Sequence, residues 1–226
     1  MTAWLQTILF WTSPAFPVGA FSYSHALEWL VEAGAVADRK DMEDYIDALI
    51  TFGDLQADAA YLAAAHRAEP EDLPHILEEA TALRGAAELA AESTDQGRAF
   101  VKALTDSGQN HPRLTTLKDA AKERTGGLLP HAVVFGAAAR DAGIPTGVAV
   151  ESWLHAAAAN LVSAGQRLVP LGQRDGVTAL TNLKPAIEAA ARQAQDTAIE
   201  DITNAGIAVD MAAMLHETQY TRLFRS

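Results

Sequence analysis

Alanine is the feature that most limits what this chain can fold into, since it fills roughly a fifth of the 226 positions. It is the residue that most favours the α-helix. Runs of β-branched or aromatic residues with the period-two alternation of a strand are missing. We therefore predict an all-α chain without strands, and the length suits a single domain over residues 1–226 at least as well as two.

Apolar side chains at helical spacing, and the proline and glycine breaks between them, predict where the helices lie. The 147–169 stretch has apolar or small residues on nearly every face, which is typical of a helix enclosed by others. We expect about eight to ten helices packed closely around this central apolar helix. They should cover about 3–11, 23–32, 38–67, 72–104 with an interruption near Ser93, 115–124, 132–142, 147–169, 178–195 and 199–217.

The composition disfavours several classes of protein. Apolar residues make up 49% and charged residues 20% of the chain, a balance typical of globular proteins rather than disordered ones. The formal net charge of -12 includes no run of Lys or Arg that could bind nucleic acid or an anionic membrane. There is no cysteine, no signal-peptide pattern and no apolar stretch of about 18 residues, so we expect a soluble cytoplasmic protein.

No motif of a familiar catalytic or cofactor site is present. The seven histidines are scattered singly, and the P-loop, dinucleotide-binding and nucleophile-elbow motifs are missing. Glu151 and His155 stand at i and i+4 on the predicted central helix and could share a face. Two ligands do not make a metal site, and a hydrogen-bonded or core histidine is the simpler explanation. We therefore predict no enzyme, no cofactor and no resident metal.

The alternative is a helical enzyme or small-ligand-binding protein with a pocket between helices near Glu151, His155 and Arg167. Arg167 is the residue that supports this alternative. A cation within so apolar a helix should need a partner such as a carboxylate, and that partner could be structural or functional.

Aromatic residues are concentrated near the start of the chain, where seven of the fifteen fall within the first 29 positions. Such a cluster marks either a core or an interface. For Phe16, Phe21 and Tyr23, in or beside the irregular Pro/Gly segment 13–22, contact with a partner is as plausible as core packing. Core packing is the better prediction for the three aromatic residues of the first helix, Trp4, Phe10 and Trp11.

The end of the chain is the second irregular element. Residues 219–226 follow the last predicted helix and place two arginines around a Leu-Phe pair. A frayed terminus is the simplest interpretation. An aromatic, an aliphatic and two cationic side chains are also what a docking peptide carries, so we favour a tail that a partner orders.

These irregular elements resemble a known family, the urease accessory protein UreF. Residues 13–24, SPAFPVGAFSYS, followed by Leu27-Glu28-Trp29, match its opening signature, and TRLFRS at 221–226 matches its end. Shorter agreements lie between them, so the resemblance spans the chain in order. They are Glu92 with Gln96-Gly97, Pro130-His131 with Phe135-Gly136, and Arg167 with Pro170-Leu171-Gly172-Gln173. Two departures are Ala26, where the family usually has glycine, and 174–177, where it usually has Thr-Asp-Gly-Gln.

The resemblance implies an all-α protein, usually a homodimer, that acts as a chaperone and adaptor in maturation of a nickel enzyme. It implies binding to UreD (also called UreH), recruitment and regulation of the GTPase UreG, and help with nickel insertion into apo-urease, without enzymatic activity of its own. The predicted partner-binding residues lie in the irregular segment 13–22, beside it, and in the tail, with Gln173 apart from all three. They are Phe16, Pro17, Gly19, Phe21, Ser22, Tyr23, Glu28, Gln173, Tyr220, Arg222, Leu223, Phe224, Arg225 and Ser226.

Overall fold

The computed structural model describes residues 4–226, and within that range the chain forms α-helices and two short 3-10 turns with no strand. The prediction of an all-α single domain is confirmed. The expected start of the first helix, Ala3, lies outside the described residues. The elements are α1 (Trp4–Trp11), η1 (Ala20–Ser22), α2 (Leu27–Glu32), α3 (Arg39–Thr51), α4 (Asp54–Arg67), α5 (Leu73–Ala82), α6 (Ala87–Asp106), α7 (Pro112–Arg124), α8 (His131–Asp141), α9 (Thr146–Leu168), α10 (Gln173–Asp196), η2 (Ile199–Asp201) and α11 (Ile207–His216).

Two of the expected helices are each divided in two. The predicted 38–67 helix breaks between α3 and α4, where Gly53 has extended backbone dihedrals (φ −103°, ψ −154°). The predicted 72–104 helix breaks at residues 83–86, so the interruption near Ser93 was wrong and Ser93 lies inside α6. The chain turns at Gly85, where a Cβ atom would overlap the Asp210 carboxylate of α11.

The boundaries of four other elements also differ. α2 begins four residues later than expected because His25 and Ala26 have positive φ angles of 56° and 65°, which do not belong to a right-handed helix. α7 and α10 begin earlier than expected, at Pro112 and Gln173. The expected 199–217 helix consists of η2, an irregular connection and α11.

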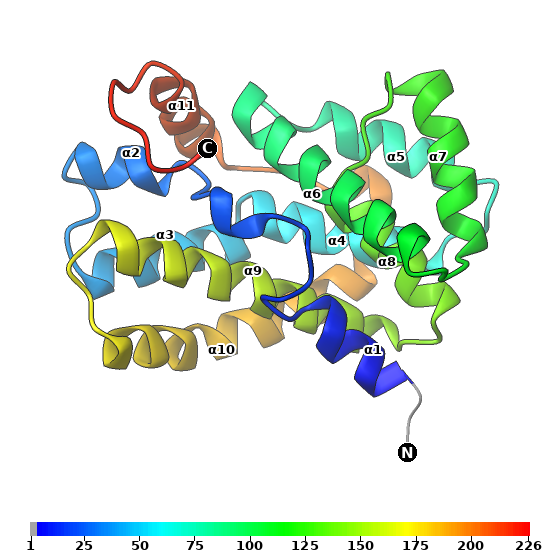
Figure 1. The fold of residues 1–226 in the computed structure, drawn as a ribbon, viewed down its shortest axis with the longest axis horizontal. Helices are drawn as coiled ribbons and strands as arrows, with labels where there is room; N and C mark the ends of the chain where they lie inside the picture. The colour runs from blue at the N-terminus through cyan, green and yellow to red at the C-terminus, as the bar shows by residue number, and fades with distance from the viewer. Residues whose placement is uncertain (1–3) are drawn as a thin grey trace.

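The central helix is α4, not the 147–169 helix that the sequence pattern favours. Twelve of the 14 residues of α4 are buried. α9 instead exposes several side chains to solvent, among them Glu151, His155 and Arg167. Figure 1 shows α4 running through the middle of the molecule behind α9, with α10 beside α9, α5 and α7 at one end, and α2 and α11 at the other. The irregular segment 13–22, within the connection between α1 and α2, crosses the front of this array, and the C-terminus lies next to that connection.

α4 and α8 pack at close range because glycine allows their backbones to approach. A Cβ atom added to Gly136 of α8 would overlap the carbonyl oxygen of Leu62 in α4 and lie 3.0 Å from its carbonyl carbon. No flexible side chain can move aside there, since the obstacle is backbone. The approach therefore fixes the distance between the two most buried helices.

Substituting Gly136→Ala should destabilise the protein by about 3 kcal/mol, at the upper end of what overpacking costs, because α8 must shift away from α4. The control is Gly147→Ala near the start of α9, where the added methyl would meet only the side chain of Gln195. Urea unfolding followed by circular dichroism measures both. Equal stability of the two variants would contradict the close approach.

Candidate functional site

The tail folds back onto the irregular segment, so the two elements singled out in the sequence form one site. The backbone N–H groups of Leu223 and Phe224 donate to the two carboxylate oxygens of Glu28, at 2.6 and 2.8 Å. Arg225 N–H donates to the carbonyl of Ser22 at 2.8 Å. The tail is thus held by main-chain hydrogen bonds to α2 and to the residues just before it.

The end of the tail is enclosed. Ser226 is fully buried. Its carbonyl oxygen accepts one hydrogen bond from the N–H group of Ser24 at 3.0 Å and another from the Ser24 hydroxyl at 2.5 Å. The hydroxyl of Ser226 donates to Glu92 of α6 at 2.7 Å. Phe224, 4% exposed, joins the main core beneath Arg167, whose guanidinium lies 4.3 Å from the ring centroid. The terminus is therefore ordered within the chain itself.

Arg167 has a partner, but not the carboxylate that the sequence led us to expect. Both terminal nitrogens of its guanidinium donate to the carbonyl of Phe21 at 3.1 Å, and its face covers Phe224. It is exposed at the end of α9, so its charge keeps contact with water. Arg167 thus fastens the irregular segment to the tail.

A second cluster holds the base of the tail. His216, the last residue of α11, is fully buried and contacts Glu28 at 3.2 Å and Glu88 at 2.7 Å through its two ring nitrogens. Arg222 donates to Glu88 and, at 2.8 Å, to the carbonyl of Arg225. Glu28 therefore joins α2, α11 and the tail.

A buried charge network lies beneath the irregular segment. His25 contacts Asp54 at 3.0 Å and Glu92 at 3.2 Å, and Asp54 also pairs with Arg84 at 3.0 Å. Burial alone would lower the pKa of His25, but the charges and hydrogen bonds of Glu92 and Asp54 outweigh it and raise that pKa to about 10. His25 is therefore a buried imidazolium at neutral pH, and Arg84 and His25 hold the pKa of Asp54 below its ordinary value against the effect of burial.

His25 reaches this position through an unusual backbone. Both His25 and Ala26 lie in the left-handed region, which costs a residue with a Cβ atom roughly 1–2 kcal/mol. The carbonyl of His25 accepts a bond from the Tyr45 hydroxyl, and Ala26 is fully buried against α6 and α11. A glycine at position 26 would carry no such strain.

The structure separates the predicted partner-binding residues by exposure. Gly19 and Ser22 are half-buried and belong to the irregular segment. Gln173 is exposed at the start of α10, a different element from the tail and its carboxylates. The buried ones are Phe16, Tyr23, Glu28, Phe224 and Ser226, and the other exposed ones are Pro17, Phe21, Tyr220, Arg222, Leu223 and Arg225.

The aromatic residues of α1 divide in the same way. Trp11 is buried and Trp4 packs against the core, as predicted, whereas Phe10 is half-exposed and the prediction of core packing was wrong for it. Phe10 instead lies edge-on to Phe16 with ring centroids 5.1 Å apart. α1 is an edge helix, so only one of its faces can reach the core.

Sequence reasoning missed the acidic residues that receive the tail. Glu88, Glu92 and Asp95 of α6 contact Arg222, Ser226 and Arg225 respectively, and Asp95 also accepts a bond from the Tyr23 hydroxyl at 3.0 Å. Their spacing of i, i+4 and i+7 puts them on one helix face. That acidic stripe was visible in the sequence, whereas His216 carried no signal of its own.

The alternative pocket is only partly where it was expected. A cavity of about 620 Å³ lies under residues 11–21, and His155 lines it, but Glu151 and Arg167 do not. Within residues 4–226, no group of three or more His, Asp or Glu side chains is placed to hold a metal ion. None of the helices in that range has the length and apolar character needed to cross a bilayer.

Substituting Glu28→Gln should release the tail, because an amide has one acceptor oxygen and would turn its NH₂ group toward an N–H donor. We expect a loss of roughly 3 kcal/mol and faster amide exchange at Leu223 and Phe224. Glu32→Gln, an exposed change at the end of the same helix, is the control. Hydrogen exchange followed by mass spectrometry measures the protection of the tail amides in both variants. Unchanged protection in Glu28→Gln would disprove that Glu28 holds the tail.

The stabilising effect of His25 should be complete below about pH 6.5, the ordinary histidine pKa, and should disappear as the pH rises through 10. The folded state binds the proton more tightly, so raising the pH favours unfolding by an amount on the order of 5 kcal/mol. The stability difference between the unaltered chain and His25→Gln should therefore shrink between pH 6 and pH 10. A ring proton of His25 that titrates near pH 6.5 in NMR spectra would refute the buried imidazolium.

Comparison with known proteins shows the family of this chain. The family model named UreF matches residues 36–184. Proteins named urease accessory protein UreF are similar over nearly the whole chain: one from Roseobacter denitrificans is 41% identical over 97% of this chain and 93% of its own length. One from Rhodopseudomonas palustris is 41% identical over 100% and 92%, and one from a Bradyrhizobium species is 40% identical over 98% and 92%. The resemblance found in the sequence is thereby confirmed, and the chain belongs to the UreF family of urease accessory proteins.

Proposed function

We propose that this chain is a non-enzymatic adaptor that binds UreD/UreH, recruits and regulates the GTPase UreG, and assists nickel insertion into apo-urease in the cytoplasm. The observation that carries the proposal is the ordered tail, which places Leu223, 63% exposed, on the surface while its backbone is fixed to Glu28. A side chain presented on a fixed backbone loses little freedom when a partner binds it.

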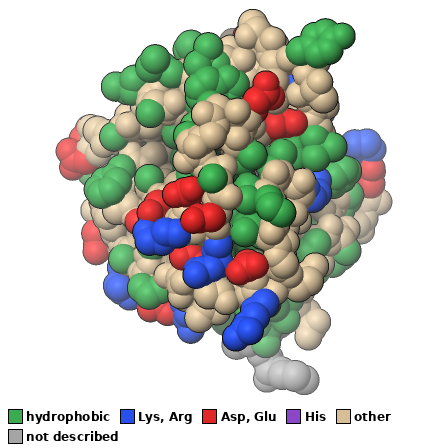
Figure 2. Space-filling view, turned by 90° about the vertical axis from the view of Figure 1, so that its left-hand side faces the viewer, with side chains coloured by type: hydrophobic (Ala, Val, Ile, Leu, Met, Phe, Trp, Pro, Cys, Tyr) green, Lys and Arg blue, Asp and Glu red, His purple; other side chains and the backbone are tan. Residues whose placement is uncertain are grey.

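An apolar surface adjoins this tail. α11 packs on α2 and α6 through Ala212 and Ala213 and leaves a second face exposed. That exposed face carries Ile207, Met211, Met214 and Leu215, at the spacing of one side of a helix. Figure 2 views the side of the molecule where α2 and α11 lie, and hydrophobic side chains gather over its upper part. Large exposed apolar patches mark interaction sites, so we assign α11 and Leu223 to UreD/UreH.

A second apolar surface lies elsewhere on the molecule. α1 exposes Leu5, Leu9 and Phe10, and it lies at the opposite edge of the array from α11 (Figure 1). An adaptor that is also a homodimer needs at least two separate contact surfaces. We therefore propose α1 for the contact between two copies of the chain.

Co-purification with UreD/UreH and UreG from the same source, followed by urease activation in a strain that lacks this chain, tests the adaptor function. The expected result is a complex that contains all three proteins and restores nickel-dependent urease activity. Failure to bind UreD/UreH or UreG would reject the proposal.

Leu223→Asp should abolish capture of UreD/UreH without loss of fold, because a carboxylate at an apolar contact must be desolvated and Leu223 itself packs little against the chain. Deleting 222–226 would be less informative, since it would also remove Phe224 from the core. We expect at least a tenfold weaker affinity in a pull-down titration.

Two matched changes serve as controls for Leu223→Asp. Leu9→Asp, on α1 at 57% exposure, should convert the dimer to monomer in light scattering and leave UreD/UreH capture of the monomer intact. Val177→Asp, on α10 at 68% exposure, should change neither property. Capture that survives Leu223→Asp would contradict the assignment of the tail to UreD/UreH.

A further inference from the structure

Two of the four methionines of the chain lie on the exposed face of α11 that we assign to UreD/UreH. Met211 is 59% exposed and Met214 is 49% exposed, and their spacing of three residues puts both side chains on one side of the helix. Ile207 lies one turn before Met211 on the same face, and Leu215 lies one turn after it. The middle of this apolar surface therefore consists of thioethers that are open to solvent.

The rest of the described chain offers an oxidant no comparable sulfur atom. There is no cysteine, so no thiol competes with the methionines. Met42 of α3 is fully buried, and a Cβ atom added to Gly165 of α9 would overlap its sulfur. Met1 lies outside the described residues. Within residues 4–226, the solvent-exposed thioethers are thus confined to α11.

The contacts that hold α11 in place lie on its other face. Ala212 and Ala213 pack against α2 and α6, and His216 contacts one glutamate of each of these helices. Neither Met211 nor Met214 belongs to the hydrophobic core. A chemical change at the two sulfur atoms should therefore alter the surface of α11 and leave the fold intact.

We propose that Met211 and Met214 form a peroxide-sensitive modification site whose oxidation prevents UreD/UreH binding, an inference that rests on the proposed function of α11. The sulfur lone pair attacks one oxygen of hydrogen peroxide, and an S–O bond forms as the O–O bond breaks. The sulfur loses two electrons, and the second oxygen leaves as water with both protons of the peroxide. The product is a methionine sulfoxide, which is polar where the thioether was apolar.

The sulfoxide opposes binding because its oxygen is a hydrogen-bond acceptor that water satisfies in the free chain. A partner that covers the face of α11 removes this water, and an apolar contact surface supplies no donor in its place. Oxidation of both methionines should therefore weaken UreD/UreH capture at least about tenfold. Because methionine sulfoxide is reducible by methionine sulfoxide reductases, the loss of binding should be reversible.

Treatment of the full chain with hydrogen peroxide, followed by peptide mass mapping and a pull-down titration with UreD/UreH, tests the inference. We expect one added oxygen at Met211 and one at Met214, none at Met42, an unchanged circular dichroism spectrum and at least about tenfold weaker capture. Methionine sulfoxide reductases should then restore capture. An untreated chain that does not capture UreD/UreH would reject the proposed function and this inference with it. Equal capture before and after oxidation of both methionines would overturn this inference alone.

A double variant, Met211→Leu with Met214→Leu, keeps the face of α11 apolar and removes both sulfur atoms. It should capture UreD/UreH as the unaltered chain does and should keep that capture after peroxide. Met42→Leu, the matched change at the buried methionine, should remain as sensitive to peroxide as the unaltered chain. If peroxide abolished capture by the double variant as well, the site of oxidation would lie elsewhere and the inference would be wrong.

Discussion

The carboxylate of Glu28 is the contact on which the arrangement of the functional site depends. One oxygen accepts the N–H of Leu223, and the other accepts the N–H of Phe224 and contacts His216. A buried carboxylate is stable only when its lone pairs are satisfied. The tail therefore supplies hydrogen bonds that the buried carboxylate of Glu28 needs, and Glu28 in turn fixes the tail. Neither the buried carboxylate nor the folded-back tail would be stable without the other.

The turn that follows the irregular segment stores strain that the surrounding contacts offset. Two consecutive residues with a Cβ atom, His25 and Ala26, adopt left-handed dihedrals, and such conformations persist only where the environment determines them. Here the environment is the ion pairs of His25 with Asp54 and Glu92 and the enclosure of Ala26 between α6 and α11. The strained turn aims Glu28 at the tail, so the buried charges beneath it indirectly set the tail's position.

Much of the fold was predictable because helix periodicity and proline and glycine breaks are local signals. The identity of the central helix was not, since α4 and α9 each contain six alanines and only tertiary packing decides which of the two is enclosed. The two irregular elements were also recognisable in the sequence, but their union was not. The contact between the two elements depends on Glu28 and on the acidic stripe of α6, Glu88, Glu92 and Asp95. In the sequence these three residues look like the acidic residues of an ordinary solvent-exposed helix face. The prediction of core packing was wrong for Phe10 because the sequence around an aromatic residue does not show whether its side of the helix faces the core or the solvent.

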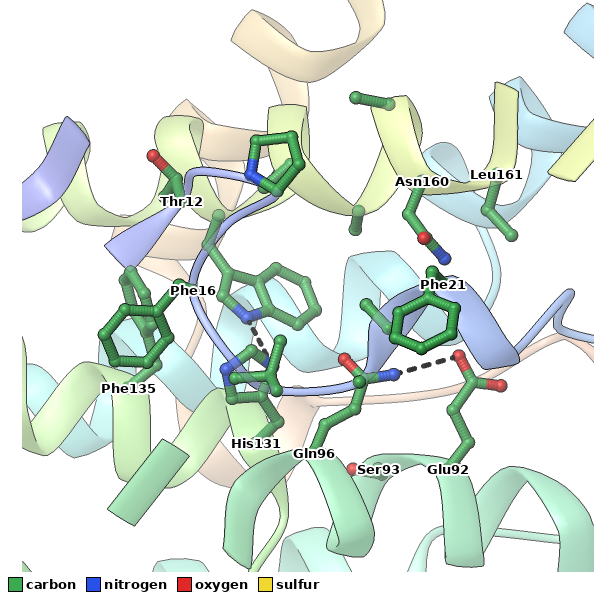
Figure 3. A pocket seen from close by; sticks show the side chains of 18 of the residues that line it. Thr12, Phe16, Phe21, Glu92, Ser93, Gln96, His131, Phe135, Asn160 and Leu161 are labelled. Atoms are coloured by element: carbon green, nitrogen blue, oxygen red, sulfur yellow. Dashed lines mark hydrogen bonds between the residues drawn. The ribbon is translucent and has the colours of Figure 1, made fainter. Parts of the chain in front are cut away.

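Glu92 connects the tail to the cavity. Its Oε2 atom accepts the Ser226 hydroxyl and contacts His25, whereas its Oε1 atom receives only a long bond from Gln96 and borders the cavity. Glu92 therefore belongs both to the contacts that hold the tail and to the lining of the cavity (Figure 3), so a change of this one side chain affects both places.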